Sequence, residues 1–287
     1  MSVYQDLKSA SARAGGSHLT REARQLTITR FSEYLKDNNI QIKGAEHVRE
    51  KHIIGYLAQR DIATRPKQNE LSHLRVSLRE CGRADFADRL GTQRMGVDKA
   101  TREGTHRAIT DTEYAKARGE LVAKDAGCAA AAALCRELGL RSKEAVILQR
   151  DSLERFERQL VSLGKVEVVE GTKGGRDRWV HPANQERALV AVREAIAASK
   201  QNAKGYVVEG KGKNLKSALD KFHRVAAECG MKGKISPHSL RYAYACERLD
   251  QKIAEGYSRR EALVIVSHDL GHGDGRDTFV LQVYSKR

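Results

Sequence analysis

The feature that most constrains the fold is a single β-strand signal in a chain whose other segments favour helices. The stretch KVEVVEGTKGGRDRWVHP, residues 165–182, alternates apolar and polar residues around Gly174-Gly175, which predicts a β-hairpin. Elsewhere apolar residues recur three and four positions apart, as Ile28, Phe31 and Leu35 do. The sequence therefore predicts a mainly α protein with one small antiparallel β-sheet.

A polar, basic and glycine-containing segment interrupts the helical periodicity at GTQRMGVDKATREGTHRAIT. Such a segment is typical of a linker between domains. We therefore expect a helical front domain at residues 1–95, a linker at 96–108 and a second domain at 109–287. In the second domain an alanine-rich helix should end at Gly139 in a left-handed cap, and Ser142 should cap the next short helix.

The charge of the chain points to a polyanionic partner. Lys and Arg number 52 against 37 Asp and Glu, a formal net charge of +15. Nucleic acid is the first candidate, and a basic surface with no partner is the alternative. The sequence has no apolar run of the ~20 residues that span a bilayer and no apolar centre near its start, so we expect a cytoplasmic protein with no membrane partner. Its five cysteines lack metal-site spacing, which predicts reduced thiols.

The segment SPHSLRYAYA, residues 236–245, has the composition of an anion-binding helix start. Ser236 is a good N-cap and Pro237 suits the first helical position. His238 and Arg241 then lie one turn apart on one face, beside free backbone N–H groups at the positive end of the helix dipole. This pattern predicts a phosphate site, and an ordinary polar helix start is the alternative.

A second unusual segment, SHDLGHGDGRDTFVLQVYSKR, occupies residues 267–287. A helix should end at Gly271 and leave His272 just beyond it, and Tyr284 should lie at the end of a further helix. A free phenol has a pKa of about 10, so a nucleophilic tyrosine needs an activating environment. The alternative for Tyr284 is a tyrosine that only packs.

Taken in order, several of these elements resemble the catalytic domain of the tyrosine recombinases, the phage-type integrases. The resemblance covers about residues 105–287, and the front half resembles the family's helical, SAM-like DNA core-binding domain. Glu144 resembles the acidic residue that supports the site in family members. The elements that carry the resemblance are Arg141, Lys173 on the hairpin, HSLR, LGHG and the late Tyr284.

The resemblance implies a site-specific DNA recombinase of a phage or mobile element, which needs neither a cofactor nor a metal. Tyr284 would attack a DNA phosphate and form a 3′-phosphotyrosyl link. Arg141 and Arg241 would hold the non-bridging oxygens.

The remaining roles that the resemblance implies concern protons and hydrogen bonds. Lys173 would protonate the departing 5′ oxygen, His238 would act as base toward the tyrosine hydroxyl, and His272 would donate to a non-bridging oxygen. The segment between His272 and Tyr284 is longer than the usual family spacing, which indicates a small insertion.

The resemblance also implies partners. We expect double-stranded DNA, a dimer on one site, a tetramer when two sites are joined, and accessory proteins that bend DNA or set direction. A protein of this kind would associate with the nucleoid of a prokaryotic host.

Three other functions are open to this sequence. A type IB topoisomerase-like enzyme would cut and reseal one strand, and a decayed integrase would bind DNA without cleaving it. A metal-dependent phosphohydrolase would use HDLGH, in which His268 and His272 are four apart, with Asp269 and Asp274 nearby. Other possible nucleophiles are Tyr242, Tyr244 and Tyr257.

Overall fold

The computed structural model describes residues 2–100, 106–172, 174–272, 275 and 280. The chain divides into two compact units, Met1–Thr101 and Arg102–Arg287. Each unit has its own apolar core. The described helices include none with the length and apolar character that crossing a membrane requires.

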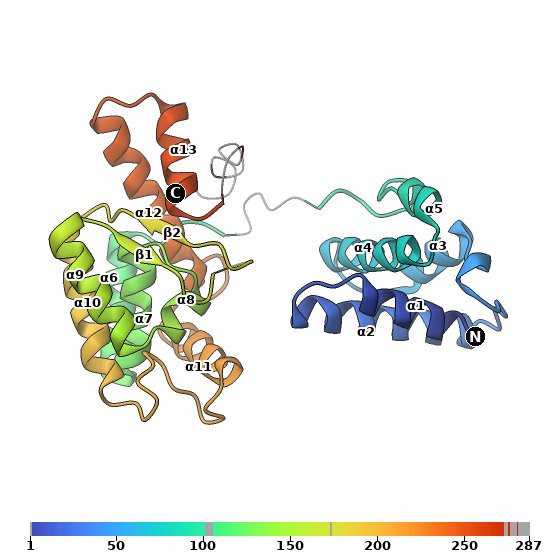
Figure 1. Ribbon diagram of the computed structural model, residues 1–287, viewed down its shortest axis with the longest axis horizontal. Helices are drawn as coiled ribbons and strands as arrows, with labels where there is room; N and C mark the ends of the chain where they lie inside the picture. Colours follow the sequence, from blue (N-terminus) through green and yellow to red (C-terminus); the bar gives the residue numbers. More distant parts are fainter. Residues whose placement is uncertain (1, 101–105, 173, 273–274, 276–279, 281–287) are drawn as a thin grey trace. The chain divides into compact units, whose positions relative to one another are not determined.

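The front unit is helical (Figure 1). Phe31 and Tyr56 meet edge to face at its centre, with ring centroids 5.4 Å apart. The buried Glu70 carboxylate accepts hydrogen bonds from Tyr56, Arg30 and Arg60, so a charged group in this core is fully paired. Its helices are α1 (Val3–Arg13), α2 (His18–Asp37), the 3-10 turn η1 (Ala45–His47), α3 (Glu50–Gln59), α4 (Thr64–Glu80) and α5 (Ala84–Arg89).

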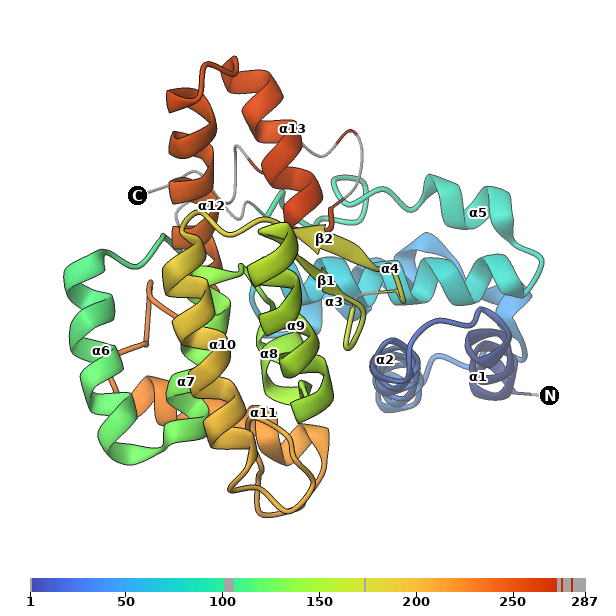
Figure 2. The ribbon, with the colours of Figure 1, turned by 60° about the vertical axis from the view of Figure 1, so that its left-hand side comes forward.

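The back unit is built around the alanine-rich helix α7 (Ala126–Glu137), which is buried from Cys128 onward. Small side chains let neighbouring helices approach it closely, and α6, α8, α10 and α12 all pack against it (Figure 2). The other helices are α6 (Asp111–Lys124), α8 (Ser142–Ile147), α9 (Arg150–Leu163), α10 (Gln185–Ser199), α11 (Leu215–Glu228), α12 (Pro237–Ala254) and α13 (Arg259–Asp269).

Strands β1 (Val166–Val168) and β2 (Arg178–Val180) form an antiparallel hairpin. This hairpin is the one β-sheet in the described part of the chain. Val166 pairs with Val180, and Val168 pairs with Arg178. Because strand side chains alternate, this register turns Arg178 and Val180 to the buried face and leaves Trp179 outside. The predicted fold class, mainly α with one small antiparallel sheet, is confirmed.

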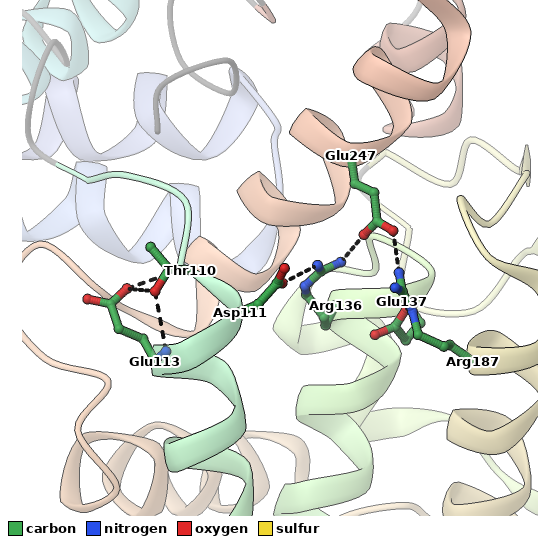
Figure 3. Close-up of polar contacts among 7 residues, drawn as sticks. All are labelled: Thr110, Asp111, Glu113, Arg136, Glu137, Arg187 and Glu247. Atoms are coloured by element: carbon green, nitrogen blue, oxygen red, sulfur yellow. Dashed lines mark hydrogen bonds and ion pairs between the residues drawn. The ribbon is translucent and has the colours of Figure 1, made fainter. Parts of the chain in front are cut away.

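An ion-pair network around Arg136 fixes α7 against three other helices (Figure 3). The buried Arg136 guanidinium donates to Asp111 Oδ1 on α6 at 3.0 Å and to Glu247 Oε2 on α12 at 2.6 Å. Arg187 on α10 donates to the other oxygen of Glu247 and to Glu137 Oε2 at 2.9 Å. The network thus holds together the two helices, α7 and α12, from which Arg141 and Arg241 are positioned.

Candidate active site

The turn after α7 places Arg141. Gly139 has a φ of +56°, and a Cβ there would lie 2.4 Å from Cδ1 of Tyr244, so only glycine fits this turn. Arg141 follows as the N-cap of α8, and its backbone N–H donates to Glu144 Oε2 at 2.7 Å. The prediction that Ser142 caps α8 is therefore wrong, because the Glu144 carboxylate reaches back one turn and fixes Arg141 in the cap position.

The Glu144 side chain has no exposed surface and accepts hydrogen bonds from two arginines. Arg141 Nη1 donates to Oε1 at 2.7 Å, while Arg178 Nη1 and Nη2 donate to Oε1 and Oε2 at 2.9 and 2.7 Å. Burial by itself raises the pKa of this carboxyl, but Arg178, and then the charges of Arg241 and Arg141, lower it to about 2. Glu144 is therefore an anion at any physiological pH.

Arg141 and Arg241 meet at one backbone carbonyl. Arg241 lies on α12 with no exposed surface, and its guanidinium donates to the carbonyl oxygens of Gly139 and Leu270. Arg141 Nη2 donates to the same Leu270 oxygen at 3.2 Å. The structure therefore brings together two arginines that are distant in the sequence.

The electrostatic balance of this cluster favours an anion. Three guanidinium groups, those of Arg141, Arg178 and Arg241, surround the single carboxylate of Glu144, which leaves an excess of positive charge. Arg141 keeps 21% of its side chain exposed and is the accessible member. Guanidinium groups bind phosphate oxygens with paired hydrogen bonds, so the cluster has the chemistry of a phosphate site.

The two predicted histidines lie on the elements that form this cluster. His238 is half-buried in the first turn of α12, one turn before Arg241, and meets the Tyr242 ring edge to face with centroids 5.0 Å apart. His272 is half-buried just past α13, where its backbone N–H donates to Ser267 O at 3.0 Å. It follows Leu270, the acceptor shared by the two arginines, by two residues.

Lys173 and Tyr284 lie outside the described residues. Gly171, two residues before position 173, is described and packs against α8. Gly171 has a φ of +72° and packs so closely that a Cβ there would lie 2.7 Å from Ile147 Cδ1 and 3.4 Å from Glu144 Cα. The hairpin loop therefore begins against the helix that carries Glu144.

The other tyrosines differ in their surroundings. Tyr244 is buried, its hydroxyl donates to the His181 carbonyl at 2.7 Å, and burial raises its pKa well above the ordinary value. It is a structural tyrosine rather than a nucleophile. Tyr242 is also buried, whereas Tyr257 lies near the far end of α12 from His238, with the Lys252 ammonium 5.3 Å from its ring centroid.

The His-Asp metal hypothesis has no support in the described part of the chain, where no group of three potential ligands is arranged to hold a metal ion. His268 is exposed, but Asp269 points inward. Its carboxylate contacts His181 Nδ1 at 2.9 Å and Arg248 Nε at 3.1 Å. Asp274 lies outside the described residues.

The sequence interpretation missed Arg178 and considered Asp269 only as a possible metal ligand. Arg178 joins Glu144 to the end of α13, where its Nε donates to the Asp269 carbonyl oxygen at 3.0 Å. The available signal was strand alternation, because Arg178 has the same parity as the buried Val180. A charged residue at an inward position needs a buried partner.

Two models of known protein families match this chain. A family model described as Integrase matches residues 96–247, more than half of the chain, and a model described as phage integrase, N-terminal, matches residues 1–87. Comparison with curated protein sequences found no match.

Solved structures share the fold. A lambda integrase tetramer bound to a Holliday junction has a TM-score of 0.62 at 16% identity, over 99% of this chain and 78% of the other. A lambda integrase dimer bound to a COC′ core site also has 0.62, at 14% identity, over 100% and 79%. XerH site-specific recombinase bound to difH substrate has 0.57 at 17% identity, over 94% and 76%.

Fold and family matches together define the class of protein as a tyrosine-type site-specific recombinase. The chain belongs to the integrase family, as the resemblance in its sequence predicted.

Proposed function

We propose that this recombinase cleaves and rejoins DNA through a 3′-phosphotyrosyl intermediate formed by Tyr284. The observation that carries the proposal is the convergence of Arg141 and Arg241 on the Leu270 carbonyl, two residues before His272. An excess of positive charge at this point suits a phosphate that gains negative charge in the transition state.

The reaction conserves the phosphodiester and needs no oxidant or nucleotide. The Tyr284 oxygen attacks phosphorus, the bond to the 5′ oxygen breaks, and the phosphate stays on the 3′ end. The tyrosine proton passes to His238, and Lys173 gives a proton to the departing 5′ oxygen. Attack by a 5′-hydroxyl of the partner strand reverses these steps on new DNA.

The arginines and His272 would stabilise the charge on the non-bridging oxygens. Arg141 is exposed enough to meet the phosphate directly, whereas the Arg241 guanidinium is enclosed and bonded to two carbonyls. A phosphate oxygen therefore reaches Arg241 only by displacing groups that cover it. DNA binding would supply the energy for that exchange.

Double-stranded DNA is the proposed substrate. The net charge of +15 and the DNA-bound states of the similar structures support this. We assign core-site binding to residues 1–95 and catalysis to residues 109–287, with a dimer on one site and a tetramer in synapsis. The biological role we propose is integration or excision of a phage or mobile element.

Covalent trapping tests the mechanism. The protein is mixed, in EDTA, with nicked duplexes tiled from the DNA that flanks its own gene, then denatured and resolved on a gel. We expect an SDS-resistant protein–DNA adduct and a free 5′-hydroxyl. Tyr284→Phe should form no adduct while binding DNA with nearly unchanged affinity.

Three outcomes would contradict the proposal. An adduct that persists in Tyr284→Phe would move the nucleophile to another residue. Cleavage that appears only with added Mn²⁺ or Mg²⁺, without an adduct, would favour a metal-dependent hydrolase. If adducts form but two sites are never joined, the enzyme would resemble a type IB topoisomerase in its activity.

A further inference from the structure

Arg178 contacts both sides of the arginine cluster. It projects from β2 with only 5% of its side chain exposed and binds both oxygens of Glu144, while its Nε donates to the Asp269 carbonyl. This use of three separate N–H groups depends on the planar guanidinium, because a lysine ammonium cannot match the carboxylate with two parallel bonds.

Glu144 connects Arg178 to Arg141. Oε1 accepts from a guanidinium nitrogen of each arginine, and Oε2 accepts from Arg178 and from the Arg141 backbone N–H. Both the main chain and the side chain of Arg141 are therefore held by a carboxylate that Arg178 orients.

The turn after α13 is held by the same side chain. Gly271 has a φ of +64°, and a Cβ there would lie 2.7 Å from Arg178 Cδ. This turn carries the Leu270 carbonyl, which Arg141 and Arg241 share, and leads to His272. One arginine of the hairpin therefore packs against the turn that follows α13 and pairs with the carboxylate of α8.

We propose that Arg178 is a positioning residue for strand cleavage, which holds Arg141 through Glu144 and holds the Leu270–His272 turn by direct contact. This inference rests on the proposed function. Arg178 lies on β2, the strand that follows the loop beginning at Gly171. The hairpin would therefore help to orient the arginines of the site.

The first test compares cleavage rates on a nicked duplex by single-turnover adduct formation. Arg178→Met should slow adduct formation about 100-fold, because displacing a catalytic group by about 1 Å has an effect of that size. Arg178→Lys, which keeps the charge but loses the paired hydrogen bonds, should slow it about tenfold. DNA affinity should change less than about twofold in both variants, because Arg178 itself is buried.

The pH profile separates positioning from folding. The charged and titratable groups that face Glu144 in the described chain are Arg141 at the N-cap of α8, Arg178 on β2, Arg241 on α12 and Cys135 on α7. Arg178 contributes most to lowering the pKa of Glu144, so that pKa should rise in a variant that lacks Arg178. The cleavage rate of Arg178→Met should therefore fall as the pH is lowered from about 8 to about 6, relative to wild type.

A double variant distinguishes a loss of positioning from a loss of folding. Arg178→Met combined with Glu144→Gln removes the stranded carboxylate, so its melting temperature should rise above that of Arg178→Met. Its cleavage rate should stay low and lose the added pH dependence, since Arg141 still lacks its charged acceptor.

Arg248→Met is the matched control, because Arg248 is also buried and pairs with Asp269 at 3.1 Å without touching Glu144. It should lower the melting temperature but leave the rate within about threefold of wild type. If wild type forms an adduct and the Arg178 variants cleave as fast as Arg248→Met, the inference is overturned. If wild type forms no adduct, the proposed function fails instead.

Discussion

Arg141 and Arg241, which are one hundred positions apart in the sequence, donate hydrogen bonds to the same carbonyl oxygen, that of Leu270. Two like charges at one point repel each other in a poorly solvated site. The carbonyl dipole at the end of α13 and the Glu144 carboxylate offset this repulsion. The two guanidinium groups are thus already held beside each other before any substrate arrives.

The depressed pKa of Glu144 predicts a specific pH dependence of stability. Its folded pKa of about 2 lies below the ordinary value of 4.5, so the stabilisation is complete above pH 4.5 and is lost as the pH falls toward 2. The shift corresponds to about 3 kcal/mol. Urea unfolding of wild type and Glu144→Gln should show a gap that is constant from pH 5 to 7 and shrinks below 4.5. A gap that widens in acid would contradict the ionised state of Glu144.

Gly139→Ala should destabilise the protein by about 2 kcal/mol or more, because the new Cβ meets the Tyr244 ring and the backbone has a positive φ. Gly119→Ala provides the control. Gly119 lies inside α6, and nothing lies within 4 Å of a Cβ there, so alanine should stabilise by about 0.5–1 kcal/mol. Chemical denaturation measures both, and equal effects would be inconsistent with the described turn.

Tyr244→Phe should cost about 0.5–1.5 kcal/mol, since it removes the hydroxyl that donates to the partly buried His181 carbonyl. The variant should still form the covalent adduct, because the Tyr244 hydroxyl of the wild type only donates a structural hydrogen bond. Thermal unfolding and adduct formation are measured on one preparation. Loss of the adduct in a variant that remains folded would reopen Tyr244 as a candidate nucleophile.

Arg136→Met should destabilise the back unit by about 1.5–3 kcal/mol, because it removes a buried guanidinium that donates to the half-buried Glu247 and the exposed Asp111. Arg193→Ala breaks the exposed pair with Glu157 and should cost less than about 1 kcal/mol. The two variants are compared by urea unfolding. A small effect of Arg136→Met would mean that apolar packing alone fixes α7 against α12.

Local signals made most of the fold predictable from the sequence. Ser236 is the N-cap of α12 with Pro237 at its first position, and Gly139 follows the alanine-rich helix with a positive φ, as the sequence predicts. These features depend on residues within one helical turn. The hairpin was equally evident, because alternation and two glycines lie within a few residues of each other.

The contacts inside the candidate site depend on long-range packing. Glu144 and Arg178 are 34 positions apart, and no local pattern shows that a strand arginine reaches a helix carboxylate. The prediction that Ser142 caps α8 is wrong for a related reason. The Glu144 carboxylate accepts from the Arg141 backbone N–H, which makes Arg141 the N-cap. The roles of Lys173 and Tyr284 stay predictions from the family resemblance.

The shared acceptor at Leu270 has a consequence for the order in which the chain is made. During synthesis the ribosome adds Arg141 and Arg241 before it adds Leu270, whose carbonyl accepts from both. A nascent chain, or a product terminated before Leu270, therefore has the front unit and both arginines but no assembled arginine pair. The two guanidinium groups therefore share an acceptor only once the chain extends past α13.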